Sequence, residues 1–207
     1  DITLTYNQTR QAGITRELGI GASALLTDMN QPLGDWVGHA SEIRETMELL
    51  AGGGPAETRE LTLALAAELG RLLDADLSRE RLMALLASGA AHERFAKWAV
   101  AQGAAPSWFD APELPLAPVE RPFLAARSGV LSRVHNRQIG LLLAAAGGAR
   151  QQVGAELAHG VALRYRARLG RKVEKGEELA RVYLRRDDPA LVERFAACFE
   201  IADAGEA

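Results

Sequence analysis

The sequence predicts an α/β protein in two parts: a helical segment that keeps one or two strands of a larger mixed sheet, and a compact α+β unit after it. Three observations support this fold class. Between residues 39 and 102, apolar residues recur at helical spacing in four runs. Five of the eight prolines fall between Pro106 and Pro122. Beyond Pro122, apolar positions alternate and are interrupted at Gly170 and Gly176.

The first structured residues are expected just after the amino-terminal dozen. Residues 15–20 have the features of a last helical turn that closes at Gly19. Residues 22–26 are apolar and are followed by polar Thr27 and Asp28, a pattern typical of a buried parallel strand that reaches its carboxyl end. Ligands bind at that end of open α/β sheets, so the loop 28–34 is a candidate functional position.

Four helices are then predicted, at 39–50, 57–73, 78–88 and 91–102. The first ends at three consecutive glycines, and the third begins at Ser78, a residue type favoured at helix N-caps. The positions expected on the inward faces are Ile43, Met47 and Leu50 in the first helix, Leu61, Leu65, Leu69 and Leu72 in the second, Leu82, Leu85 and Leu86 in the third, and Phe95, Trp98 and Ala99 in the fourth.

Residues 106–121 are predicted to be an extended connector, because proline lacks the backbone N–H that helices and central strands require. A second unit then runs from 122 to 207. It is expected to contain a helix over 137–146, capped by Asn136, and small antiparallel strands within 161–184. A last helix opens at Asp188 and Pro189, with Leu191, Phe195, Cys198 and Phe199 turned inward.

Composition narrows the classes of protein that fit. The net charge of −3 argues against a general nucleic-acid binder or a binder of anionic membranes. The only cysteine, Cys198, excludes an intrachain disulfide and a cysteine-built zinc site. No run approaches the roughly 18 apolar residues of a membrane span. A cytoplasmic location is therefore expected.

A long motif carries a resemblance to a known family. Residues 24–34 read ALLTDMNQPLG, and 37–45 read VGHASEIRE. Further landmarks follow at Gly129–Val130, Gly147–Arg150 and 173–177, read as VEKGE. This order resembles thymidine and pyrimidine nucleoside phosphorylases, over roughly residues 15–203. Residues 1–14 do not match, so the predicted division is 1–14 unmatched, 15–105 part of the phosphorylase α/β domain, 106–121 connector, and 122–207 the hammerhead or barrel-sandwich-like carboxy-terminal domain.

The resemblance implies a parent reaction in which phosphate displaces the base of a pyrimidine deoxynucleoside. In the family, the phosphate loop and the arginine, serine and lysine that hold the base lie upstream of residue 22. This chain is therefore expected to hold no catalytic and no substrate-binding residue of its own, and to be inactive alone. The sequence of this chain does not distinguish a preference for thymidine from a preference for uridine. The parent is expected to be a homodimer and to need no cofactor.

The resemblance also implies part of a cation site. Some family members hold a potassium-like ion through backbone carbonyls and one glutamate, at positions that match Leu33, Trp36 and Glu45 here. The remaining ligands fall outside this chain, so the site is expected to be incomplete. Glu45 also fits a solvated helix residue, and Asp28, Asn30 and Gln31 fit a loop that satisfies its own backbone.

Rival interpretations concern the second unit. Gly147–Gly148 fits a helix stop better than a phosphate loop, because no helix amino end follows. Arg164, Arg166 and Arg168 fit one exposed strand face. The turn around Lys175 is similar to that of biotinyl and lipoyl carriers, but the tripeptides M-K-M and D-K-A are absent. A carrier domain and a purely structural or interaction module remain the alternatives. The four histidines form no metal or catalytic pattern.

Overall fold

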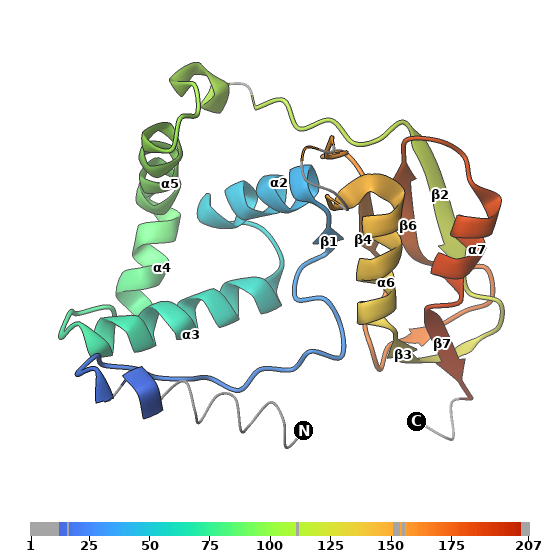
Figure 1. Ribbon diagram of the computed structural model, residues 1–207. Coiled ribbons are helices and arrows are strands. Elements are labelled where there is room, and N and C mark those ends of the chain that lie inside the picture. Colours follow the sequence, from blue (N-terminus) through green and yellow to red (C-terminus); the bar gives the residue numbers. More distant parts are fainter. Residues whose placement is uncertain (1–12, 16, 111, 151–153, 155, 204–207) are drawn as a thin grey trace.

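The computed structural model describes residues 13–15, 17–110, 112–150, 154 and 156–203. The predicted segment 1–14 therefore lies almost wholly outside the described residues. The helices of the first half lie on one side of the molecule, and the strands lie on the other side together with the last two helices (Figure 1). The first half holds β1 (Trp36–Val37), α2 (His39–Leu50), α3 (Ala56–Leu72), α4 (Arg79–Ala87), α5 (Ala90–Ala101) and the 3-10 helix η1 (Pro106–Phe109).

The four predicted helices are confirmed, and local chemistry sets their ends. The Ser78 hydroxyl accepts a hydrogen bond from Arg81 N–H and caps α4. The C-cap of α2 is Ala51, and Gly52 follows with φ +90°, a conformation that glycine adopts without strain. The turn before the loop also agrees, because Ile20 N–H donates to Thr15 C=O and Gly19 has φ +70°.

The predicted parallel strand at 22–26 is wrong. These residues are extended but lie in no sheet, and the exposed fractions of Leu25 and Leu26 are 36% and 75%. All strand pairs among the described residues are antiparallel, so no remnant of a mixed sheet is seen there. A strand exists only when a neighbour takes up its hydrogen bonds, and no described residue pairs with this segment.

The inward faces of three helices also differ from the prediction. In α5 no residue is buried, and Trp98, predicted to point inward, is 58% exposed. In α2 the buried residues are Ala40, Ser41, Glu45 and Leu49, while Ile43 is 38% exposed. In α3 they are Leu63 and Gly70, while Leu65 and Leu69 are 49% and 53% exposed. The apolar stripe that the spacing identified on α3 is real, but much of it faces away from the described residues.

The connector is only partly extended. Pro106–Phe109 form a 3-10 helix, and Val119 to Arg121 already belong to β2 (Val119–Leu124). Pro122 lies inside β2, which is tolerated because β2 is an edge strand of its sheet. The domain boundaries at 105 and 121 stay predictions.

The carboxy-terminal half is built from two antiparallel sheets. The four-stranded sheet has the order β1-β4-β6-β2, with β4 (Ala162–Tyr165) and β6 (Glu178–Leu184) at its centre. The three-stranded sheet has the order β5-β3-β7, formed by β5 (Lys172–Val173), β3 (Gly129–Val134) and β7 (Phe199–Ala202). The predicted small antiparallel strands are thus confirmed, and β1 joins them from the far end of the chain.

Two helices complete this half. α6 (Asn136–Leu143) continues into η2 (Ala144–Gly148), where Gly147 at φ +99° ends the helix as predicted. Its N-cap is His135 rather than Asn136, whose amide instead donates to Met29 C=O. α7 (Pro189–Ala196) opens as predicted, with the Asp188 carboxylate accepting from Leu191 N–H.

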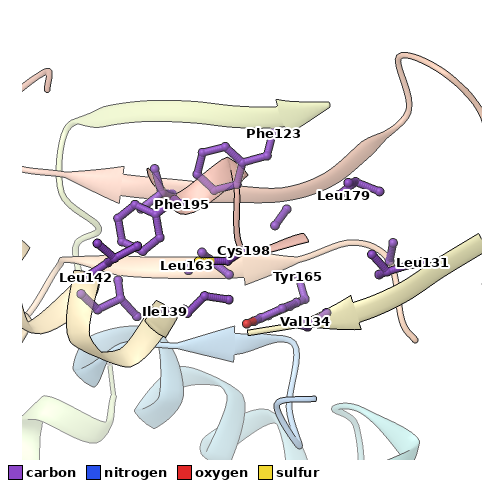
Figure 2. Close-up of a cluster of buried hydrophobic side chains, with 14 of the residues drawn as sticks. Phe123, Leu131, Val134, Ile139, Leu142, Leu163, Tyr165, Leu179, Phe195 and Cys198 are labelled. Carbon is purple, nitrogen blue, oxygen red and sulfur yellow. The ribbon is translucent and has the colours of Figure 1, made fainter. Parts of the chain in front are cut away.

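The main core lies between the sheets, α6 and α7 (Figure 2). Phe195 is fully buried, and its ring stacks on Phe123 at a centroid distance of 6.1 Å. Leu131, Leu163 and Val182 are also fully buried around it. The helical half has a much smaller cluster, in which only Leu63, Leu82 and Leu86 are buried. The strand-rich half therefore supplies most of the apolar burial in the described residues.

Candidate functional site

The loop 28–35 is fastened to the strand-rich half at several points. Asn30 N–H donates to the Asp28 carboxylate at 2.9 Å, the local turn that the sequence predicts. The Gln31 side chain reaches further, since its Oε1 accepts from Leu169 N–H at 3.0 Å. Sequence reasoning did not foresee this second contact, which joins residues 138 positions apart.

Arg168 is the main anchor of this loop. Its guanidinium donates to Pro32 C=O at 2.7 Å and to the Asp35 carboxylate at 2.7 Å. Its side chain is only 26% exposed, so the ion pair with Asp35 is partly shielded from water. Arg168 thus fixes the point at which the loop leads into β1. The prediction that the three arginines form one exposed strand face did not include this role.

The other two arginines of that predicted face also have partners. The Arg164 guanidinium lies 5.0 Å from the centre of the Trp36 ring, within the range of a cation–π contact. Arg166 lies 3.7 Å from Glu178 across the sheet. These side chains hold β1, β4 and β6 together.

Glu45 is the buried acidic residue of this region. It is 7% exposed, and its Oε1 accepts from Asp35 N–H at 2.8 Å. A Cβ built at Gly34 would lie 2.0 Å from Glu45 Oε2, so the carboxylate in this position occupies the space that a side chain at position 34 would take. Burial raises the pKa of the Glu45 carboxyl, and the N–H groups of Asp35 and Trp36 oppose this shift. The interpretation of Glu45 as a solvated residue is therefore wrong.

The predicted cation ligands are partly brought together. Glu45 contacts the backbone of Gly34, Asp35 and Trp36, so its carboxylate lies against the stretch between Leu33 and Trp36. Leu33 C=O already accepts from the Thr58 hydroxyl at 3.2 Å and has a second lone pair. One carboxylate with nearby carbonyls suits a hard, weakly held cation.

Two of the four histidines meet, which their sequence spacing does not reveal. The rings of His39 and His159 are 5.8 Å apart in an edge-to-face arrangement, and His39 Nε2 lies 2.8 Å from Gly148 C=O. They line a pocket of about 600 Å³ with Ile43, Trp108 and Leu114. Within the described ranges, no three histidine, cysteine, aspartate or glutamate side chains gather as a metal site.

The turn around Lys175 is a compact strand connection. Lys175 N–H donates to the Ser128 hydroxyl at 2.9 Å, and Gly176 has φ +87° between β5 and β6. Gly176 N–H donates in turn to Ala125 C=O. The backbone of this turn is thus used to join the two sheets.

Among the described residues, the structure contains no helix that could span a membrane.

Comparisons with known proteins show which proteins this chain resembles. Residues 130–202 match the family described as "Pyrimidine nucleoside phosphorylase C-terminal domain". The chain is 39% identical over 199 residues to the thymidine phosphorylase of Burkholderia orbicola, covering 91% of this chain and 45% of that protein. It is 37% identical over 165 residues to the thymidine phosphorylase of Mycobacterium tuberculosis, covering 80% of this chain and 37% of that protein.

A third relative is named a pyrimidine-nucleoside phosphorylase rather than a thymidine phosphorylase. The pyrimidine-nucleoside phosphorylase of Staphylococcus aureus is 33% identical over 198 residues, covering 92% of this chain and 45% of the relative. The chain thus spans less than half the length of these relatives. Residues 130–202 thus match the carboxy-terminal domain of pyrimidine nucleoside phosphorylases, and the chain is similar over nine tenths of its own length to thymidine and pyrimidine-nucleoside phosphorylases.

Proposed function

We propose that this chain is the carboxy-terminal portion of a thymidine phosphorylase. The parent reaction breaks the bond between the base nitrogen and C1′ of the sugar, and forms a bond from a phosphate oxygen to C1′. The base leaves with the electron pair and is protonated, giving thymine and 2-deoxyribose 1-phosphate. The observation that carries this proposal is the 39% identity over 91% of the chain to a thymidine phosphorylase.

The chain's part in that reaction is structural. Its candidate loop is held by Arg168, Leu169 and Asn136 through hydrogen bonds to Pro32, Asp35, Gln31 and Met29. These hydrogen bonds engage the polar groups of the loop and fix the course of its backbone. We assign no catalytic and no substrate-binding residue to this chain, and we interpret 122–207 as the barrel-sandwich-like domain of a homodimeric, cytoplasmic parent.

The first test is the activity of the chain alone. Purified chain incubated with thymidine and phosphate is expected to release no thymine, since each missing donor to the leaving base or phosphate costs roughly 10² to 10³ in rate. Thymine is quantified by liquid chromatography, with and without phosphate. Phosphate-dependent release of thymine that follows the chain through a second purification step contradicts the proposal.

The second part of the proposal concerns the cation. We propose that Glu45 and the carbonyls of Leu33 and Trp36 supply part of a potassium-like site that the rest of the parent protein completes. The supporting observation is the buried carboxylate of Glu45, whose Oε1 accepts from Asp35 N–H and which has a loop with carbonyls beside it. A bound cation would offset the cost of burying this negative charge.

Glu45 also predicts a pH dependence of stability. Its folded-state pKa is raised above the ordinary 4.5, so the folded state binds more protons than the unfolded state above that pH. Its contribution to stability is therefore full at acid pH and is lost as pH rises above 4.5 and through the folded-state pKa. In Glu45→Gln this decline is expected to vanish, measured by urea unfolding from pH 4 to 8.

A matched variant and a salt comparison complete the test. Glu48→Gln, on the exposed side of the same helix, should keep the decline. At pH 7, KCl should raise the unfolding temperature of the unchanged chain more than choline chloride at equal ionic strength does, and should not do so in Glu45→Gln. An equal KCl effect in both proteins rules out Glu45 as a ligand.

A further inference from the structure

The pocket of about 600 Å³ lies where the two halves of the chain meet, between α2, the connector after η1 and the turn that precedes β4. The proposed phosphorylase function uses none of its lining residues. The Arg44 guanidinium donates to Leu114 C=O and so holds the connector beside α2 (Figure 1). Pockets for small organic molecules have volumes of about 300–1,000 Å³, so this one is large enough for such a ligand.

Aromatic and aliphatic groups form much of its wall. Trp108 is partly buried, and its ring packs edge to face against Phe109 at a centroid distance of 5.0 Å. Ile43, Leu114 and Pro115 supply aliphatic surface. A flat apolar body such as a benzene ring gains by covering these groups. The face of an indole ring also attracts a positive charge.

Two carboxylates give the pocket a negative charge. Glu42 lines it from α2, where its Oε1 accepts from Gly38 N–H at 3.0 Å, and Glu113 lines it from the connector. Neither carboxylate forms an ion pair with a described residue. The described lining residues include no lysine or arginine, and the nearby Arg44 is engaged by Leu114 C=O. The pocket therefore favours a cation over an anion.

The two histidines of the pocket add a hydrogen-bond acceptor. His39 Nε2 lies 2.8 Å from Gly148 C=O and so carries a proton, which leaves Nδ1 of the neutral ring as an acceptor. The His159 ring meets this ring edge to face at 5.8 Å. Among the described residues these rings belong to no cluster of three metal-binding side chains. Imidazole nitrogens and carboxylates are acceptors that suit the N–H donors of an ammonium group.

We propose that this pocket binds a small organic cation with a flat apolar body, a protonated aromatic amine. Its ring lies against Trp108 and the aliphatic wall, and its ammonium group is attracted by Glu42 and Glu113. All the lining residues belong to this chain, so the proposal does not depend on the phosphorylase function. The ligand contacts both halves and the connector, and its binding should raise the unfolding temperature of the chain.

The test uses three probes that share a phenyl ring and differ in charge. At pH 7, 2-phenylethylamine is a cation, 2-phenylethanol is neutral and 3-phenylpropionate is an anion. Isothermal titration calorimetry of the 207-residue chain at low salt should give a dissociation constant of about 0.1–1 mM for the amine, as expected for a ligand of its size. The alcohol should bind about fivefold more weakly, because it lacks the attraction to two partly exposed carboxylates. The anion should bind more weakly still.

Glu113→Gln separates the charge of the pocket from its shape. This variant should weaken binding of the amine about fivefold and leave binding of the alcohol unchanged. Glu174→Gln is the matched control, because it makes the same change of charge at an exposed turn of the strand-rich half, and it should leave both affinities unchanged. Circular dichroism checks the fold, which both variants should keep because both glutamates are exposed.

Trp108→Leu tests the aromatic wall. It should weaken binding of the amine and of the alcohol about fivefold or more, since it removes the ring on which both probes stack. If this variant does not fold, the comparison of Glu113→Gln with Glu174→Gln decides alone.

Three results overturn the proposal. The first is equal affinity for the amine and the alcohol, which would show that the carboxylates do not select a cation. The second is an equal loss of amine affinity in Glu113→Gln and Glu174→Gln, which would reflect the net charge of the chain rather than this pocket. The third is an absence of amine binding at concentrations up to about 10 mM.

Discussion

Phe195→Ala is expected to destabilise the chain by about 3–5 kcal/mol, the usual cost of deleting a buried aromatic ring. Phe195 is fully buried at the centre of the main core, where its ring stacks on Phe123. The same replacement frees α7 from the sheets, because Phe195 is the buried residue of that helix. Since domains have stabilities of roughly 5–15 kcal/mol, such a loss would unfold much of the population at moderate temperature.

Urea unfolding followed by circular dichroism measures this change. Leu141→Ala is the control, because Leu141 is 56% exposed and its loss should cost less than about 0.5 kcal/mol. A loss below about 1 kcal/mol for Phe195→Ala would show that α7 does not pack into the core as described.

Gly38→Ala is expected to cost more than about 2 kcal/mol, because it combines backbone strain with a steric clash. Gly38 has φ +144°, a region that residues with a side chain rarely adopt. A Cβ there would lie 2.6 Å from Val161 C=O and 2.8 Å from Ala162 Cα. Both contacts are with the backbone, which cannot move aside cheaply. The position is where α2 begins against the start of β4.

Gly140→Ala supplies the matched comparison. Gly140 lies inside α6 with open space around it, so alanine there should stabilise the helix by about 0.5–1 kcal/mol. The two replacements thus have opposite predicted signs in the same unfolding experiment. A stabilising Gly38→Ala would mean that α2 and β4 are not in the close contact that joins the two halves.

The structural features that the sequence predicts correctly are local ones. Glycines ended helices at Gly52 and Gly147, and Ser78 and Asp188 capped helices, because each signal acts within a few residues of its own position. The antiparallel strands of the second unit were also predictable, since their turns contain the glycines at 170 and 176.

What it missed depends on distant partners. Residues 22–26 have the composition of a strand, but a strand also needs a neighbour, which the described residues do not supply. The stripe of Leu65 and Leu69 was identified as inward, but the two side chains are 49% and 53% exposed. Likewise, the burial of Glu45 and the anchoring of the loop by Arg168 arise from chain segments that no local pattern connects. The cation site came from resemblance and stays a proposal.

The most direct measurement is phosphorolysis of thymidine by this chain co-expressed with the amino-terminal part of a thymidine phosphorylase relative. The chain together with the amino-terminal polypeptide of the Burkholderia relative should form thymine and 2-deoxyribose 1-phosphate in equal amounts, while each alone forms neither. Thymine formation by the 207-residue chain alone, or its absence from a pair that is purified as a stable complex, would contradict the account of this chain as the non-catalytic carboxy-terminal part of a phosphorylase.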